Sequence, residues 1–534
     1  MTLILPLVLV FSALFLLYKY LTRNNSYFRD RNVPHRKPIP IFGNQLKLMF
    51  QLESAPDNLI NVGNEFRNEP YVGLFDFSQP SLCIQDPEMI KQLGIKHFEN
   101  FVNHRIFGES NADELFLNSL FMMKDQKWKD MRATLSPAFT GNKMRMMFHL
   151  VKHCAENMVS YCHEQCGDTE IMTVKPRELF TKVTTDIIST CAFGLEVDCL
   201  RDPNNDIFKN AKKILDFDHP LLMFKFLFIM MMPKVAKWMK MSVTPHETTN
   251  FFKDLVRDTI AYRRKTNTYR PDVIQLLIEA MDGKLKHDTE KNDEDAGLAT
   301  IQESDIGKKD GRRDWTDGEI AAQCFLFFLA GYETTGTLLN FAAYQLAVDQ
   351  EVQAKLYDEV RETENKLNGE TVSYEELMKM QYLDAFICEC LRMFPPMVAI
   401  DRVCNKDTTI EDGKGNSFTI PKGMTIFFNT FGVHYNHKYY PNPGKFDPNR
   451  FYGENKKNIQ PHLFISFGIG PRACVGSRFA LMQMKLILYY MIANFSFEIS
   501  EKTIIPLRFA KSVRFEPEGC VVDLKKRIKL DLLS

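Results

Sequence analysis

The sequence has no excess of charge of either sign, because its 67 lysines and arginines equal its 67 aspartates and glutamates in number. Nucleic-acid binding requires a basic surplus or a basic stripe, so the composition does not support a nucleic acid as partner. The 12 cysteines also lack the paired spacing of a zinc finger or a disulfide framework. We therefore expect most of them to be reduced core residues of a protein that faces the cytosol.

Phenylalanine and methionine are abundant instead, with 43 and 26 residues, and both suit a large apolar interior with adaptable packing. At about 150 residues per domain, 534 residues would suggest several domains. However, only residues 283–313 resemble a linker, because they are rich in Asp, Glu, Lys and Gly and contain no aromatic residue. We interpret them as a flexible surface insertion in one large domain over 45–534.

The N-terminus begins with an apolar run over residues 3–18, followed by Lys19 and Arg23. A cleaved signal peptide would carry a basic start and a small-residue cleavage site, and neither is present. Basic residues stay on the cytoplasmic side of a membrane. The sequence therefore predicts an uncleaved signal-anchor helix over 1–22, in contact with membrane lipid and with the body of the protein in the cytosol.

Two further segments bear on how the body meets the membrane. Residues 23–44 form a basic, proline-rich hinge, in which Pro34, Pro38 and Pro40 cannot continue the anchor helix. A second apolar stretch, 221–233, is too short to span a bilayer. It is either a buried core helix or a surface loop that dips into the membrane.

Amphipathic helical patterns dominate the body. One begins at Thr316, where Thr316 and Glu319 form a capping-box pattern before an apolar run. It continues to about residue 347, roughly 45 Å at 1.5 Å per residue. Short strand-like runs, such as 417–420 and 424–429, lie mainly in the last third. The class is mainly α with minor β.

The loop at residues 467–476 carries the most specific motif, Phe-Gly-Ile-Gly-Pro-Arg-Ala-Cys-Val-Gly. One interpretation is a dinucleotide fingerprint, because Gly468, Gly470 and Ala473 satisfy G-x-G-x-x-A before a helical pattern. However, Pro471 lies in the turn where backbone N–H groups would bind a pyrophosphate, and no acidic residue follows near position 490. We therefore reject a dinucleotide site.

The same loop suits a metal-bound thiolate at Cys474. Such a thiolate needs turns that expose the sulfur and admit a flat macrocycle, which Gly470 and Gly476 permit, and backbone N–H groups that protect it from protonation. Phe467 can shield the sulfur from water, and Arg472 offers a cation for a haem propionate. The pattern F-x-x-G-x-R-x-C-x-G resembles the haem-binding signature of the cytochrome P450 family at every defined position.

Other segments follow that family's order of motifs. Glu389 and Arg392 match its E-x-x-R, and residues at i and i+3 share a helix face, so the two can interlock. By resemblance, Arg450 completes a three-residue ion network in the core. Asn449 stands where the family often has an acidic residue, and we expect this departure to affect only local polarity.

Residues 330–335, Ala-Gly-Tyr-Glu-Thr-Thr, look like the family's oxygen-activation motif and fall midway along the expected long helix. Splitting an O–O bond at a haem requires delivered protons, which a carboxylate and a hydroxyl can relay through water. The resemblance therefore implies catalytic roles for Glu333 and Thr334. Gly331 and Thr334 also favour a local widening of the helix that could hold this water.

Several cations are expected, by resemblance, to bind the haem propionates. Trp128 and Arg132, four apart on a helix, match the family's W-x-x-x-R, and Arg402 follows the Pro-Pro turn. His104 and Arg105 are further candidates for this contact.

The resemblance implies a single large cytochrome P450-type helical domain with small β-sheets, haem b as cofactor and Cys474 as its axial iron ligand. The implied reaction inserts one oxygen atom from O2 into a lipophilic small molecule. No flavin or nicotinamide motif is present, so the expected electron donor is a separate NADPH-cytochrome P450 reductase, with cytochrome b5 as a further partner. Residues 135–139 and 270–272 resemble insect microsomal members that oxidise xenobiotics, which implies the endoplasmic reticulum membrane with the catalytic domain in the cytosol.

Two alternatives remain open. A haem-thiolate isomerase or dehydratase would rearrange peroxides without O2 or a reductase, and a non-catalytic haem protein would only bind gases. The Glu333–Thr334 pair argues against the first, because such an enzyme has no need of proton delivery. Substrates could be plant toxins, insecticides, hormones or lipids, and the pocket lining is expected to include Phe107, Phe116, Phe121, Phe327, Val398 and Ile400.

Overall fold

A computed structural model describes residues 4–105, 114–214, 222, 225, 228–229, 233–242, 244–282, 299, 315–512 and 514–527. Three expectations lie largely outside these residues: Phe107 of the pocket, the apolar stretch 221–233 and the insertion 283–313. Within the described residues helices predominate and the strands form three small sheets, which confirms a mainly α fold with minor β.

The chain packs as two compact units. The first comprises Met1–Arg105, Val398–Pro443 and Lys511–Val513, and the second Ile106–Met397, Gly444–Ala510 and Arg514–Ser534. The expected division into an anchor, a hinge and one domain over 45–534 stays a prediction.

Helix α1 (Ile4–Thr22) of the first unit is long and apolar enough to cross a membrane. Its mean hydropathy is 2.1 and none of its residues is buried. Its 19 residues extend about 28 Å, close to the thickness of a bilayer's hydrocarbon core. No other helix within the described ranges meets the same criterion.

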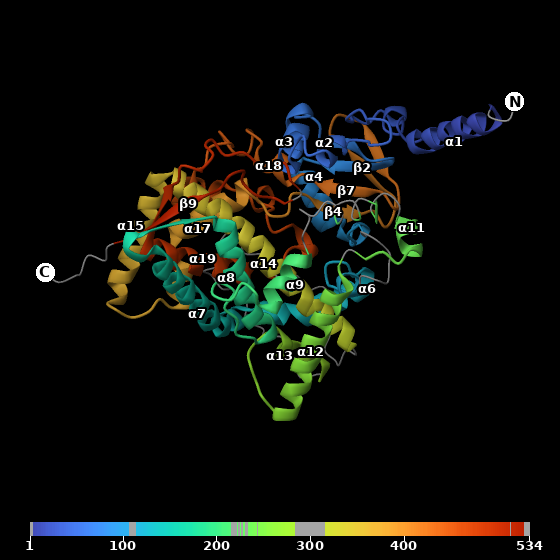
Figure 1. The fold of residues 1–534 in the computed structure, drawn as a ribbon. Coiled ribbons are helices and arrows are strands. Elements are labelled where there is room, and N and C mark those ends of the chain that lie inside the picture. The colour runs from blue at the N-terminus through green and yellow to red at the C-terminus, as the bar shows by residue number, and fades with distance from the viewer. Residues whose placement is uncertain are drawn as a thin grey trace. The chain divides into compact units, whose positions relative to one another are not determined.

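The first unit is built on a four-stranded sheet with the order β1-β2-β7-β4 (Figure 1). The antiparallel pair β1 (Tyr71–Asp76) and β2 (Gln79–Ile84) is extended by β7 (Thr425–Phe428), which runs parallel to β2, and by β4 (Ile400–Val403), which runs antiparallel to β7. A separate hairpin joins β5 (Thr408–Glu411) to β6 (Ser417–Ile420). The strands expected near 417–420 and 424–429 are thus confirmed.

Short helices complete the first unit. They are α2 (Leu46–Met49), α3 (Ala55–Glu65), α4 (Pro87–Lys91) and α18 (Thr430–His434). Helices α3 and α4 begin where a side chain accepts a backbone N–H, from Ser54 and Asp86 respectively, with a proline in the first turn. Such caps satisfy N–H groups that lack a partner inside the helix.

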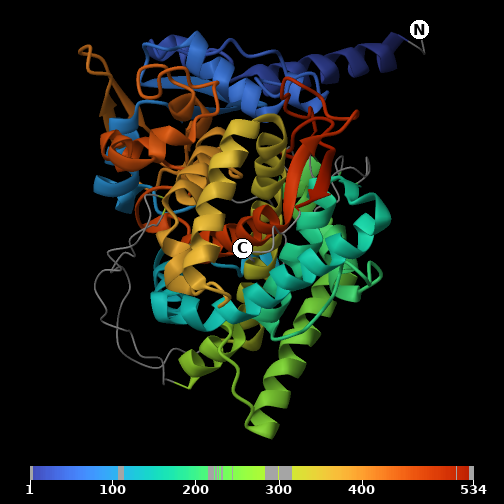
Figure 2. The ribbon, with the colours of Figure 1, turned by 90° about the vertical axis from the view of Figure 1, so that its left-hand side faces the viewer.

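Helix α14 (Asp317–Val348) is the central helix of the second unit. The expected capping box of Thr316 and Glu319 is present at its start. It packs against α8 (Pro176–Ile188), α12 (His246–Thr266), α17 (Gln381–Met393) and α19 (Ser477–Asn494), as Figures 1 and 2 show. Because neighbours surround it, most of its side chains are buried and apolar residues occur on all its faces.

The remaining elements of the second unit surround this centre. The helices are α5 (Glu114–Leu117), α6 (Asp125–Leu135), α7 (Gly141–Cys166), α9 (Asp206–Ile214), α11 (Pro233–Trp238), α13 (Val273–Met281), α15 (Gln350–Leu367) and α16 (Tyr374–Lys379). A three-stranded antiparallel sheet has the order β3-β9-β8, from Ile171–Val174, Val522–Lys526 and Phe495–Ile499.

Clustered aromatic rings account for much of this interior. Phe193, Phe252 and Phe328 meet with ring centroids 5.1 to 5.8 Å apart, and Phe341 stacks on Phe394 at 4.3 Å. Such pairs stabilise a core beyond the burial of their area. The abundance of phenylalanine therefore reflects, at least in part, the packing of helices around α14.

Candidate active site

The loop before α19 presents Cys474 to its surroundings. The N–H of Cys474 donates to the carbonyl of Phe467 at 2.8 Å, and the N–H of Ala473 donates to that of Gly470 at 2.9 Å. Gly468 and Gly470 have φ values of 86° and 70°, a region that side chains with a Cβ disfavour. Gly476, where a glycine turn was also expected, has φ −93°, which other residues can adopt, so the backbone there does not require a glycine.

Cys474 differs from the other cysteines in its exposure. Nine of the twelve are buried, two are half-buried and Cys474 alone is exposed. Protein atoms around its sulfur nevertheless remove some water from it, and this burial raises the pKa of the thiol, while the N–H of Gly476 and the charge of Arg132 lower it. A coordinated metal ion deprotonates a thiol outright, so an accessible cysteine on this loop suits a metal-bound thiolate.

Residues from α6 support this loop. Arg132 is buried and donates from Nη1 to the carbonyl oxygen of Ala473 at 2.9 Å. The guanidinium of Arg472 lies over the ring of buried Trp128, 4.1 Å from its centroid. The structure thus brings four predicted residues together: Trp128, Arg132, Arg472 and Cys474.

Arg472 has partners that sequence reasoning missed. Its Nη1 donates to the carbonyls of Leu120 and Phe121 at 3.1 and 3.2 Å, and its Nη2 donates to that of Met123 at 2.5 Å. Backbone carbonyls some 350 positions away leave no signal in the sequence. They fix the guanidinium beside the cysteine loop.

The middle of α14 is less buried than the segment that follows it. Ala330 is exposed, and Gly331, Glu333 and Thr334 are half-buried, whereas the residues from Thr335 to Ala347 are buried. The Thr334 hydroxyl donates to the carbonyl of Ala330 at 2.7 Å. The helix is continuous α-helix through this segment, so the expected local widening is absent.

Glu333 is held by an arginine from another helix. Arg177, at the start of α8, contacts Glu333 Oε1 through Nη2 at 2.5 Å and the Thr337 hydroxyl through Nη1 at 3.2 Å. Its Nε lies 3.3 Å from Glu516 Oε2. Neither Arg177 nor Glu516 was found from the sequence, because both are far from Glu333 along the chain and become its neighbours or near neighbours only in the folded structure.

The expected ion network at Glu389 is confirmed. Arg392 forms a bidentate pair with Glu389 at 2.7 and 2.8 Å, both side chains are fully buried, and Arg450 lies 3.4 Å from the same carboxylate. The N–H of Asp447 adds a fourth contact at 2.9 Å. Burial raises the pKa of Glu389, and Arg392 is the strongest opposing influence.

Arg402 lies in the first unit, on β4, with an incomplete set of partners. It is buried, its Nη1 donates to the carbonyl of Asp401 at 2.7 Å, and its Nε has no hydrogen-bond partner among the described residues. Burial lowers the pKa of Arg402 to about 10, with Asp401 opposing. A buried cation with an unsatisfied N–H fits an anionic ligand such as a haem propionate.

The neighbouring candidates His104 and Arg105 are occupied within the same unit. His104 Nδ1 lies 2.9 Å from Asp401 Oδ1, the N–H of Arg105 donates to Oδ2, and the Arg105 side chain pairs with Asp76 at 2.5 Å. Burial works against ionisation of Asp401, but His104 and Arg105 outweigh it and hold its pKa below the usual value.

The expected pocket residues are distributed over both units. In the second, Phe116 and Phe121 have ring centroids 6.5 Å apart, and Phe327 on α14 faces Phe139 at 5.2 Å. Val398 and Ile400 belong to the first unit. Phe139 was not singled out from the sequence.

Comparison with known proteins identifies similar sequences along almost the entire chain. A family model described as Cytochrome P450 matches residues 33–522. The chain is 37% identical over 512 residues to "Probable cytochrome P450 9f2" of Drosophila melanogaster, covering 94% of this chain and 95% of that protein. It is 36% identical over 503 residues to "Cytochrome P450 9e2" of Blattella germanica (92% and 91%) and 35% identical over 493 residues to "Cytochrome P450 9b1" of Drosophila melanogaster (91% and 92%).

Proposed function

Because this chain belongs to the cytochrome P450 family, whose members are haem-thiolate monooxygenases, we propose that Cys474 binds the haem iron and that the enzyme oxidises lipophilic small molecules. The observation that carries the assignment is the exposure of Cys474, unique among the twelve cysteines, on a loop whose backbone donates toward the sulfur. Other cysteines, such as Cys388 and Cys390, are enclosed in the core.

The residues around Cys474 fit the demands of a bound haem. When bound, the haem supplies the binding and reduction of dioxygen. Arg132 and Trp128 hold the cysteine loop, and together with Arg472 they are proposed partners of the propionates. Arg402, with its unsatisfied Nε, is a further proposed propionate partner. Phe467 is proposed to shield the sulfur, and its carbonyl holds the Cys474 N–H.

Glu333 and Thr334 are proposed to deliver protons. They are half-buried in the middle of α14, and the Thr334 hydroxyl, which donates to Ala330, keeps its oxygen available as an acceptor. A positioned acid typically contributes roughly 10²- to 10⁴-fold to a rate. This pair favours a monooxygenase over a peroxide isomerase or a gas-binding protein, neither of which requires proton delivery.

The finer assignments rest on resemblance and composition. We propose xenobiotics such as plant toxins or insecticides as substrates, with NADPH-cytochrome P450 reductase as electron donor and cytochrome b5 as a further partner. Helix α1 supports anchoring in the endoplasmic reticulum membrane with the catalytic domain in the cytosol. Phe327 and Val398 are proposed to contact substrate. If Phe327→Ala and Val398→Ala leave every substrate's affinity and product profile unchanged, that lining is refuted.

The test is the absorption spectrum of the reduced protein with carbon monoxide. A thiolate ligand gives a strongly red-shifted Soret band. We expect it in the wild type and in Cys154→Ser, a matched control at a half-buried cysteine on α7, and we expect its loss in Cys474→His. A red-shifted band that survives in Cys474→His would refute the ligand assignment.

A second measurement tests the reaction. Purified protein with NADPH and the reductase should consume O2 and hydroxylate lipophilic substrates, with one oxygen atom of labelled O2 appearing in the product. Product that forms from an organic peroxide alone, with no O2-derived oxygen under any condition, would instead support an isomerase.

A further inference from the structure

One face of α8 follows the segment of α14 that contains Glu333 and Thr334. Arg177, Thr181, Thr184 and Ile188 are spaced by four, three and four residues, so they share a helix face. Their partners on α14 run in the opposite order, from Thr337 back to Gly331. The two helices lie side by side in Figures 1 and 2.

The middle of this contact between α8 and α14, here called the seam, is closely packed. The Thr184 hydroxyl is buried and donates to the carbonyl of Tyr332 at 2.9 Å. A Cβ on Gly336 would lie 3.3 Å from the Thr181 hydroxyl, and a Cβ on Gly331 would lie 2.8 Å from Ile188 Cδ1. Larger side chains at these two glycines would push the helices apart, so α8 fixes the position of the α14 backbone here.

At the other end of the seam, Arg177 controls a side chain rather than the backbone. It is shared between two carboxylates, Glu333 at 2.5 Å and Glu516 at 3.3 Å. Burial works against its charge, but both carboxylates outweigh this effect and raise the pKa of Arg177. The guanidinium is therefore permanently charged and cannot itself pass on a proton. Its effect on Glu333 is to fix where that carboxylate lies.

We propose that Arg177 is a positioning residue for oxygen activation, which holds Glu333 where it can supply a proton through Thr334. The proposal rests on the function proposed above for Glu333. An ion pair with a fixed partner restricts the carboxylate to one orientation, and small displacements of a catalytic group cost large factors in rate. Without Arg177, Glu333 turns toward solvent and proton delivery fails more often.

The proposal can be tested with cumene hydroperoxide, which needs neither reductase nor an identified substrate. When a proton reaches the leaving oxygen, the O–O bond breaks heterolytically and yields 2-phenyl-2-propanol. Two molecules of a reducing dye then each supply one electron, and with two protons the second oxygen leaves as water. Without that proton, homolysis gives an alkoxyl radical, which loses a methyl radical to form acetophenone. The ratio of alcohol to acetophenone therefore reports proton delivery per turnover and is independent of the amount of folded enzyme.

We expect Arg177→Gln to lower this ratio about ten-fold, part of the roughly 10²- to 10⁴-fold that a positioned acid contributes. Arg177→Lys keeps a cation and should restore most of the ratio. Glu333→Gln should lower it at least as much, and the double variant Arg177→Gln/Glu333→Gln should lower it no further, because Arg177 acts through Glu333.

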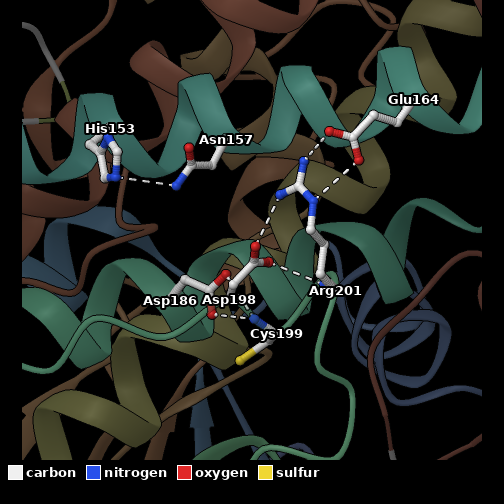
Figure 3. Close-up of polar contacts among 7 residues, drawn as sticks. All are labelled: His153, Asn157, Glu164, Asp186, Asp198, Cys199 and Arg201. Carbon is white, nitrogen blue, oxygen red and sulfur yellow. Dashed lines mark hydrogen bonds and ion pairs between the residues drawn. The ribbon is translucent and has the colours of Figure 1, made fainter.

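The matched control is Arg201→Gln. Figure 3 shows Arg201 between Glu164 of α7 and Asp198, so it is likewise an arginine shared by two carboxylates, at 2.6 and 3.0 Å. Because its partners Glu164, Asp198 and Tyr161 lie outside α14, its loss should leave the ratio unchanged. An equal shift in Arg201→Gln, or an unchanged ratio in Arg177→Gln, would overturn the proposal.

The carbon monoxide spectrum of each variant separates the two levels of inference. A red-shifted band with an unchanged product ratio in Arg177→Gln refutes the role of Arg177 and leaves the proposed function standing. A wild-type protein without that band, or one that does not react with the hydroperoxide, refutes the proposed function and the role of Arg177 with it. If Arg177→Gln does not bind haem, Arg177→Lys decides the matter: it should still lower the ratio measurably below that of Arg201→Gln, and a ratio equal to that of Arg201→Gln and the wild type would overturn the proposal.

Discussion

Removing Arg392 should destabilise the protein through the carboxylate that it leaves behind. Glu389 and Arg392 are both fully buried and joined by two hydrogen bonds of 2.7 and 2.8 Å. In Arg392→Met, Glu389 keeps, among the described residues, Arg450 at 3.4 Å and the N–H of Asp447. Breaking a buried pair on one side typically costs about 3–5 kcal/mol, and the remaining contacts place the expected loss at about 3 kcal/mol.

The loss should depend on pH in a defined direction. Burial already raises the pKa of Glu389, and Arg392 is the main influence that lowers it. Without Arg392 the folded-state pKa rises further above its unfolded value. A carboxyl group of this kind favours the folded state at low pH, and that contribution is lost as pH rises through the folded-state pKa. The deficit of Arg392→Met should therefore grow between about pH 5 and pH 8, by about 1.4 kcal/mol per unit of added pKa difference.

The assay is urea unfolding of the holoprotein at several pH values, followed by intrinsic fluorescence. The double variant Glu389→Gln/Arg392→Met should be more stable than the sum of the two single losses predicts, because no lone charge stays buried. Arg361→Met is the matched control, since Arg361 and Asp358 form an exposed pair with the same i, i+3 spacing, and it should change stability by less than about 0.5 kcal/mol. A deficit in Arg392→Met below about 1 kcal/mol, or one that does not vary with pH, would refute the reasoning.

Three further predictions concern other parts of the chain. Gly468 has a φ of 86°, so Gly468→Ala should strain the cysteine loop by about 1–2 kcal/mol and reduce the haem bound per protein, measured by absorbance. Gly444 has open space around it, so Gly444→Ala should leave the haem content unchanged. Asp186 accepts the N–H of Cys199 (Figure 3), and burial raises the pKa of Asp186 to about 7. The unfolding free energy of the wild type should therefore fall by up to about 4 kcal/mol between about pH 4 and pH 7, and Asp186→Asn should abolish this fall. A wild-type curve with no such fall would contradict this. Deleting residues 1–22 should weaken sedimentation with membranes while keeping the carbon monoxide spectrum, and undiminished membrane binding would show that α1 is not the main anchor.

Much of the architecture follows from patterns that are local in the chain. The capping box at Thr316 and Glu319 joins residues three apart, and so does the pair of Glu389 and Arg392. A helix brings such residues together whatever else the chain does. The apolar run at the N-terminus likewise predicts α1 by itself, and the motif around Cys474 indicates an exposed cysteine because its glycines permit the necessary turns.

Contacts between distant segments were decided by tertiary packing alone. Arg177 and Glu333 are 156 positions apart, and Arg472 binds carbonyls roughly 350 positions away, so no periodicity relates them. The expected widening of α14 is absent, and Thr184 and Ile188 of α8 contact this segment of a continuous helix. The sequence by itself determined the helical class, the apolar N-terminal helix, the family and the position of the cysteine, since these depend on neighbouring residues. Only the tertiary structure decided which groups restrain Glu333 and Arg472. The ion pair at Glu333 and the carbonyl contacts at Arg472 form because packing brings charged and polar groups together.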